Sequence, residues 1–191
     1  IITKYCPAAA HTSNIGLFRL HAYRRYHHTM LKQRQLDKSW IVQHIPHQGT
    51  MCLLDHVESW DVETIVCSAS SHRDVNNPLR AYQQLTTTCG IEYAAQAMAV
   101  HGALLAPVNS VRPKSGYLVS VRSTRLYVAR LDDIDADLRV EATCLARNDN
   151  DVIYQFNIRA QGRLLIDGRA AVVLNVNAPS LSSTNTLGDT L

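Results

Sequence analysis

The middle of the chain carries a long helical pattern, from Thr86 to Ala106. Small and apolar side chains recur there at intervals of three and four residues, as Ile91, Ala94, Ala95, Met98, Ala99 and Gly102. The pattern stops before Pro107, because proline cannot continue a helix comfortably. It predicts a long helix, capped at its start by Thr87 or Thr88, that is enclosed on most of its sides.

After this helix the hydrophobic period changes to two. In residues 138–146 and 152–160, apolar side chains alternate with polar ones, as in strands that bury one face. Turns are expected at 148–151 and at Gln161-Gly162. Further strand candidates lie before and after the helix, at 51–60, 63–71, 116–130 and 164–174. A curved antiparallel sheet wrapped around a long apolar helix would bury this surface, which predicts an α+β protein of the hotdog fold.

Length and composition favour a single globular domain. The chain has 191 residues, of which 46% are hydrophobic, enough for one sizeable core. We place this domain at residues 30–176. Residues 1–29 precede the first methionine and contain no acidic residue, so we interpret them as a disordered extension before a start at Met30, with a targeting peptide as the alternative. The polar residues 177–191 are expected to form a flexible tail.

Charge and cysteine content exclude several functions. The formal net charge is +3, but residues 1–29 contribute +4 and leave −1 for the rest, so no basic surface for nucleic acid is expected. The five cysteines form no CxxC pair, which argues against a disulfide framework and a zinc site. No segment has the roughly 18 apolar residues that cross a bilayer. We therefore expect a cytoplasmic protein in a reducing compartment.

Glu92 interrupts the apolar helix near its start. A carboxylate in such a place is costly unless it is neutralised, hydrogen-bonded or near the positive end of the helix dipole. One interpretation is a glutamate that pairs with an arginine or reaches an exposed edge of the helix. The other is an acid in an apolar pocket that donates a proton to a substrate.

His72 is the candidate base to accompany Glu92. It stands at the end of a predicted strand, on the segment that leads to the helix. Backbone N–H groups at the helix start, around Gly90, are candidate donors to a substrate carbonyl oxygen. Base, acid and donors together suit removal of a proton next to a thioester carbonyl and loss of a neighbouring hydroxyl group. A histidine that only decorates the surface is the alternative for His72.

Two segments resemble a known enzyme family. IVQHIPHQGTMCLLDHVESWD (41–61) is similar to the opening of β-hydroxyacyl-ACP dehydratases, with His47 and Asp55 at matching places. GIEYAAQA is similar to their central helix, where a glutamate precedes an Ala-Gln step, which implies Glu92 as the catalytic acid. HRDVNNPLR, the helix and GYLVSVRSTRLYV extend the likeness over residues 40–175 to the ApeP-like dehydratases of aryl polyene biosynthesis.

The resemblance implies an activity and partners. It implies dehydration of a 3-hydroxyacyl chain on acyl carrier protein to the trans-2-enoyl thioester, in a fatty-acid-like pathway and without metal or cofactor. It also implies a homodimer, or a heterodimer with another hotdog dehydratase, in which the two subunits contribute acid and base. One departure is that PLRAYQQL (78–85) replaces the Gly-His-Phe-Pro of the common dehydratases, so His72 would have to serve as the base. A non-catalytic partner subunit and an acyl thioesterase are the competing functions.

Five other residues have weaker claims. His44 and His47 have a metal-like spacing, but a proline lies between them and no third ligand is apparent, so a structural or surface role is favoured. His101 could line an acyl channel or satisfy backbone groups near the helix end. Arg80 is a candidate contact for the phosphate of phosphopantetheine. Cys89 is interpreted as a small buried thiol.

Overall fold

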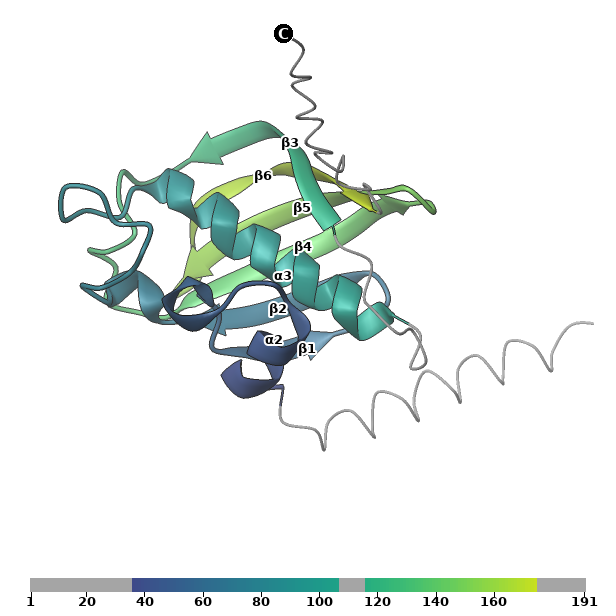
Figure 1. The fold of residues 1–191 in the computed structure, drawn as a ribbon. Helices are drawn as coiled ribbons and strands as arrows, with labels where there is room; N and C mark the ends of the chain where they lie inside the picture. The colour runs from purple at the N-terminus through teal and green to yellow at the C-terminus, as the bar shows by residue number, and fades with distance from the viewer. Residues whose placement is uncertain (1–35, 107–115, 175–191) are drawn as a thin grey trace, which may run out of the picture. The chain divides into compact units, whose positions relative to one another are not determined.

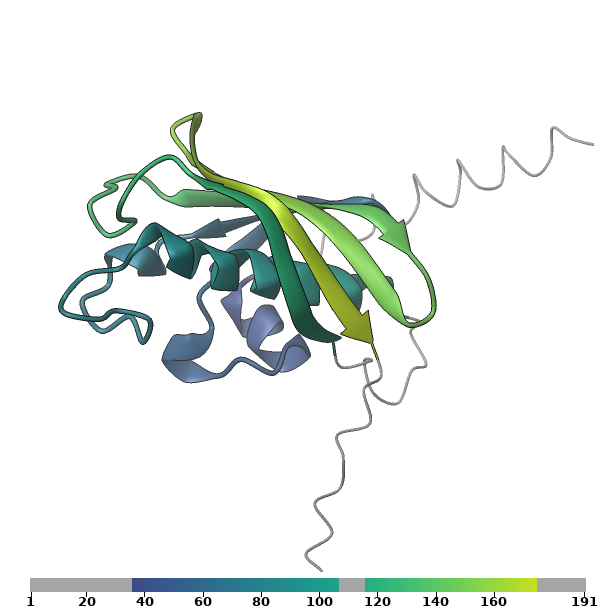
Figure 2. The same cartoon turned by 90° about the horizontal axis from the view of Figure 1, so that it is seen from above.

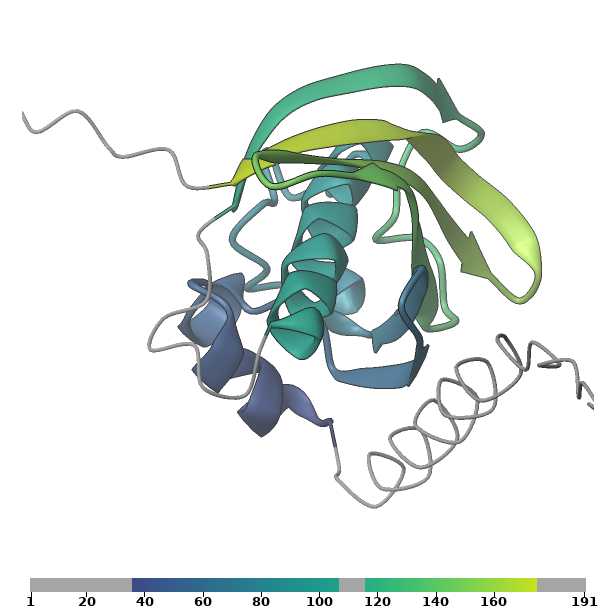
Figure 3. The same ribbon diagram turned by 90° about the vertical axis from the view of Figure 1, so that its right-hand side faces the viewer.

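A six-stranded antiparallel sheet and the long helix α3 (Gly90–Leu105) form the core of the structure. The structure is a computed structural model that describes residues 36–106 and 116–174. The expected extension (1–29) and tail (177–191) lie outside the described residues. The sheet curves around α3, and the short helix α2 (Lys38–His44) lies on the side of α3 that the sheet leaves open (Figures 1 and 3). This arrangement confirms the predicted hotdog fold.

The strands follow the predicted hydrophobic pattern closely. They are β1 (His56–Trp60), β2 (Thr64–Ala69), β3 (Gly116–Leu126), β4 (Leu138–Arg147), β5 (Asp151–Ala160) and β6 (Arg163–Leu174). Their order in the sheet is β1-β2-β4-β5-β6-β3. The alternating side chains Val152, Tyr154, Phe156 and Ile158 of β5 are all buried, as expected for the central strand of the sheet, which faces α3.

Three expectations about local structure were wrong. Neither Thr87 nor Thr88 caps α3 with its side chain, because the 3₁₀ turn η3 (Thr87–Cys89) runs directly into the helix and the Thr87 hydroxyl donates to the Val128 carbonyl instead. The strand predicted at 51–60 begins only at His56, since the 3₁₀ turn η1 (Gly49–Met51) precedes it. The exposed face of α3 includes Gly102, which was predicted in the buried stripe.

The segment between β2 and α3 projects beyond the N-terminal end of the helix (Figures 1 and 2). Its tip is a two-residue turn in which Ala81 and Gln84 exchange both backbone hydrogen bonds. The two turn residues, Tyr82 and Gln83, have φ of 53° and 64°, a left-handed conformation that usually selects asparagine and glycine. The Tyr82 side chain is 98% exposed, so packing against the described residues does not compensate for this backbone strain.

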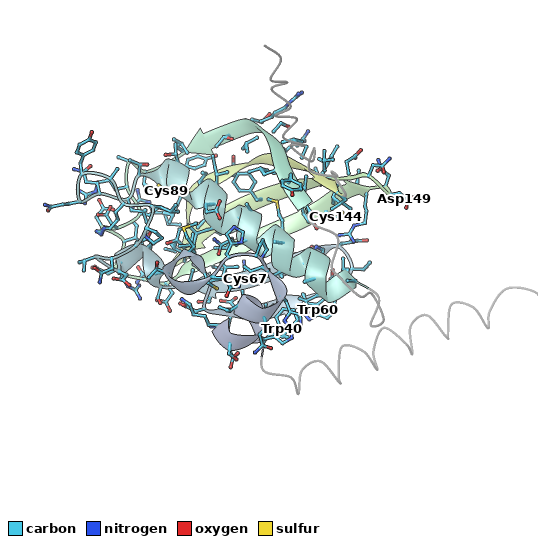
Figure 4. All side chains as sticks on the ribbon, viewed as in Figure 1. Trp40, Trp60, Cys67, Cys89, Cys144 and Asp149 are labelled. Carbon is cyan, nitrogen blue, oxygen red and sulfur yellow. The ribbon has the colours of Figure 1, made fainter. Side chains whose placement is uncertain are left out.

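The cysteines of the described residues, Cys52, Cys67, Cys89 and Cys144, are free thiols. Cys89 lies at the N-terminal end of α3, well apart from Cys67 on β2 and Cys144 on β4 (Figure 4). Burial raises the pKa of the Cys67 thiol, and the Glu58 charge adds to this effect. Within residues 36–106 and 116–174, no helix has the length and apolar character needed to cross a membrane.

Candidate active site

Gly90 lets the first turn of α3 lie close to the sheet. A Cβ atom at this position would lie 3.1 Å from Ile158 Cδ1 and 3.2 Å from Ile166 Cγ2, which is closer than ordinary side-chain contacts. The backbone N–H of Gly90 donates to the Thr87 carbonyl within the 3₁₀ turn. The N–H group that we expected to meet a substrate carbonyl is therefore already hydrogen-bonded.

Glu92 follows in the first turn of α3 and reaches the edge of the helix. Its side chain is 30% exposed, so it is not enclosed in the apolar pocket that the sequence suggested. Its Oε1 atom lies 2.9 Å from Gln96 Nε2 and 3.0 Å from His47 Nε2. The carboxyl group is thus held by two side chains while part of it remains open to solvent.

Gln96 connects Glu92 to the segment that precedes β1. It lies one helical turn after Glu92 and is fully buried. Its Nε2 group donates to the Met51 carbonyl at 2.8 Å as well as to Glu92, and its Oε1 accepts from the Leu53 N–H at 2.9 Å. Both amide hydrogens of Gln96 therefore take part in hydrogen bonds, so the orientation of the side chain is fixed.

His47 approaches Glu92 from the loop between α2 and η1. This loop is held in place by Gln48, whose Nε2 donates to the Val42 carbonyl at 2.8 Å, and by a left-handed Gly49 with φ of 57°. The His47 side chain is 27% exposed, and its Nδ1 atom is buried without a hydrogen-bond partner among the described residues. An imidazole and a carboxyl group in contact can exchange a proton, which is the chemistry of acid and base catalysis.

His72 lies in the 3₁₀ turn η2 (Ser71–Arg73) and is fully buried. Its Nε2 lies 3.0 Å from the Ile134 carbonyl, so Nε2 carries the hydrogen, and Nδ1 is a buried lone pair without a described partner. Burial lowers the pKa of this imidazole and favours its neutral form. The described contacts of Glu92 do not include His72, so this single chain does not bring the predicted acid and base together.

A buried polar cluster fixes the backbone next to His72. The hydroxyl group of Tyr93 on α3 lies 3.0 Å from the Ser71 hydroxyl and accepts from Asn77 Nδ2 at 2.9 Å. Ser71 also donates to the Leu53 carbonyl at 2.7 Å. Burial raises the pKa of Tyr93. These bonds join the segment after β2, the helix and the segment before β1 into one unit.

Asp55, which matches the dehydratase pattern, connects two strands of the sheet. Its Oδ2 atom accepts from both the N–H and the hydroxyl of Ser70, each at 2.6 Å. It therefore fastens the start of β1 to the end of β2 and does not reach Glu92 through any described contact.

Arg80 forms a buried ion pair. Its Nη2 atom lies 2.8 Å from Asp132 Oδ2, and its side chain is 15% exposed. Asp132 also binds Arg130 and accepts the Leu85 N–H at 3.0 Å. The hydrogen bond from Arg130 holds the pKa of Asp132 far below its usual range. The guanidinium group expected to meet a phosphate is thus engaged with a carboxylate.

The remaining candidates have structural contacts. His44 stacks on Trp40 with ring centres 3.8 Å apart. His101 bridges the Asp61 carbonyl and the Tyr154 hydroxyl at 2.9 and 3.0 Å, as expected for a histidine that satisfies polar groups near the helix end. Cys89 is only half-buried. Among the described residues, no group of three histidine, cysteine or acidic side chains could hold a metal ion.

His47 was not predicted as a catalytic residue, but the structure places it against Glu92. Its separation from Glu92 along the chain and its metal-like spacing with His44 gave no indication of this contact. The Pro-His step at Pro46-His47, which matches the opening of the dehydratase family, was the signal that pointed to it. The position of Gln96 one turn after Glu92 was a second signal, because residues four apart share a helix face.

Comparisons with known proteins support the fold and the family. A structure described as the dehydratase heterocomplex ApeI:P from Xenorhabdus doucetiae is 22% identical, has a TM-score of 0.63 and matches 70% of this chain and 90% of that chain. A thioesterase from Pseudomonas aeruginosa is 12% identical with a TM-score of 0.47, over 62% of this chain and 79% of that chain. A search of curated proteins found no match. The ApeP-like family model, described as ApeP dehydratase, matches residues 40–184. This chain therefore belongs to the ApeP-like dehydratase family.

Proposed function

We propose that this protein dehydrates a 3-hydroxyacyl chain on acyl carrier protein to the trans-2-enoyl thioester, in aryl polyene or fatty-acid-like biosynthesis. The observation that carries the proposal is the partly exposed carboxyl group of Glu92, held at the start of α3 by Gln96 and His47. A carboxyl group that is held in place and partly exposed is suited, in its protonated form, to donate a proton to a departing hydroxyl group.

The proposed reaction needs one base and one acid. The base removes a proton from the carbon next to the thioester carbonyl, and a double bond forms as the neighbouring C–O bond breaks. Glu92, in its protonated form, gives its proton to the hydroxyl group, which leaves as water. The thioester carbonyl makes the C–H bond acidic enough for this step without a metal or redox cofactor. Proton exchange with solvent then restores the base and Glu92.

We retain His72 as the proposed base, with His47 as the competing assignment. In both residues Nδ1 has no described partner and can accept a proton when Nε2 carries the hydrogen. Burial lowers the pKa of His72 and favours its neutral form, but the side chain is enclosed within this chain. His47 is partly exposed and touches Glu92. The choice depends on whether a substrate reaches the segment around His72.

A second candidate function is a non-catalytic subunit that completes another dehydratase. The similar structure from Xenorhabdus doucetiae is described as a heterocomplex, and β3 is an edge strand with exposed apolar side chains, namely Tyr117, Leu118, Val119 and Leu126. Such an edge favours pairing with another chain. In this case a hotdog partner would supply both the acid and the base, and the protein alone would not turn over substrate.

Intact-mass analysis of a 3-hydroxyacyl-acyl carrier protein tests the proposal. The full chain is compared with Glu92→Gln, His72→Asn and His47→Asn, and with His56→Asn, an exposed histidine on β1, as the matched control. Loss of one water with wild type and the control, but not with Glu92→Gln, supports the dehydratase. The histidine variant with the larger loss of activity identifies the base.

Other outcomes exclude the proposal. Release of a free acid would indicate an acyl thioesterase. Turnover only after addition of a partner dehydratase, with undiminished activity of Glu92→Gln in that mixture, would establish the non-catalytic subunit.

A further inference from the structure

The two oxygens of the Glu92 carboxyl group have different surroundings. Oε1 receives both described contacts, from Gln96 Nε2 at 2.9 Å and from His47 Nε2 at 3.0 Å. Oε2 has no hydrogen-bond or ion-pair partner among the described residues. Two donors on one oxygen favour a carbonyl-like Oε1 when the group is protonated, and the acidic hydrogen then resides on Oε2.

We infer that Gln96 is a positioning residue that presents Oε2 of Glu92 to the substrate hydroxyl group. This inference rests on the proposed function and deepens it, because it assigns the proton transfer to one oxygen of the acid. Gln96 is suited to this role because it is fully buried and cannot rotate without breaking its bonds to Met51 and Leu53. The same amide therefore fixes the carboxyl group and the segment that follows His47.

The amide orientation of Gln96 follows from its partners. The Leu53 N–H can only donate, so the atom facing it must be the amide oxygen. The Met51 carbonyl can only accept, so the nitrogen must face it. This nitrogen has a second hydrogen, and the only other described partner within its reach is Glu92 Oε1. Gln96 thus binds the carboxyl group as a donor whatever the protonation state of Glu92.

The test separates positioning from a purely structural role. Gln96→Met removes both donors with little change in volume, and Gln96→Glu keeps an oxygen for the Leu53 N–H but supplies at most one hydrogen in place of two. We expect either variant to lower kcat about 10- to 100-fold while KM changes less than about twofold. Tyr154→Phe, which removes a buried hydroxyl bonded to His101 near the other end of α3, is the matched control and should retain kcat.

A double-mutant cycle completes the test. If Gln96 acts through Glu92, Gln96→Met should lower the residual activity of Glu92→Gln no further, and the two substitutions should couple in thermal unfolding as well. If the wild type is active and folded Gln96→Glu has the same kcat as the wild type, the inference is overturned and the proposed function remains intact. If the wild type is inactive, the proposed function is wrong. In that case, additive effects of the Gln96 and Glu92 substitutions on thermal unfolding would also overturn the positioning role of Gln96.

Discussion

His47 Nε2 lies 3.0 Å from Glu92 Oε1, although the two residues come from a loop and a helix that are distant in the chain. The buried amide of Gln96 binds Glu92 and also Met51 and Leu53, in the segment that follows His47. The carboxyl group of Glu92 and the imidazole of His47 therefore belong to one rigid unit of the fold. A substitution at His47 should change the chemistry more than the stability.

His47→Asn should lower kcat at least 10-fold and leave the thermal midpoint nearly unchanged. The shorter side chain cannot reach Glu92, and misplacement of a catalytic carboxyl group is costly in rate. The side chain is partly exposed, so its loss removes little buried surface. Steady-state kinetics and thermal unfolding, with His56→Asn as control, check this expectation. Unchanged kcat would mean that the contact with Glu92 has no part in turnover.

His72→Asn should lower the free energy of unfolding by about 2–4 kcal/mol, because it removes buried ring atoms and leaves the Ile134 carbonyl without its donor. Urea unfolding followed by circular dichroism measures this difference. A stability equal to that of wild type would contradict the buried position of this side chain. Kinetics of the folded variant then report separately on its proposed role as base.

Stability should fall as the pH drops below about 6.5. Burial lowers the pKa of both His72 and His101 in the folded state from the ordinary value of 6.5, so the unfolded chain binds more protons in this range. Stability from these neutral histidines is present above pH 6.5 and is lost on acidification, at up to about 2.7 kcal/mol per pH unit for two such groups. Unfolding free energies at pH 8, 6.5 and 5.5 test this. A flat profile would count against buried neutral histidines.

Gly168→Ala should destabilise the fold, whereas Gly102→Ala should stabilise it. A Cβ atom at Gly168 would lie 2.8 Å from Phe156 Cζ, and nothing lies within 4 Å of one at Gly102. Overpacking against the buried Phe156 ring costs about 1–3 kcal/mol, and alanine in an exposed helix gains about 0.5–1 kcal/mol over glycine. Opposite shifts of the urea midpoint are expected. Shifts of the same sign would contradict the packing around β6.

Tyr82→Asn combined with Gln83→Gly should stabilise the protein by about 1–2 kcal/mol. Both residues occupy the left-handed region, where this pair relieves backbone strain. Gln161→Asn, at a turn that already has Gly162 in its second position, is the control and should gain less. If the Tyr82 and Gln83 substitutions destabilise the isolated protein, the turn has contacts that the described residues lack.

The strands were predictable because a period of two reports directly on burial. Residues of β5 alternate in sequence and in the structure, since this central strand meets α3 on one face only. The enclosure of Glu92 was not predictable in the same way. Small residues around it indicate close packing of a helix, but they do not tell which edge stays open.

The pairing within the candidate site could not be read from any local pattern. His72 was expected near the helix start, but the Ile134 carbonyl, more distant in sequence, binds its ring. Arg80 was expected to contact a phosphate, but its guanidinium group forms an ion pair with Asp132. Local sequence does not encode which loop covers a side chain, whereas the resemblance to a family did place His47 and Glu92 in matching motifs.

The order of the strands also determines when the fold can be completed during synthesis. Besides its hairpin with β1, β2 pairs with β4, and β3 pairs with β6, so both strands leave the ribosome before these later partners exist. The central helix emerges between them and has no finished sheet to lie against. Because Gly116 pairs with Leu174, the last strand closes the sheet, and earlier arrest of translation would leave apolar strand edges exposed to chaperones.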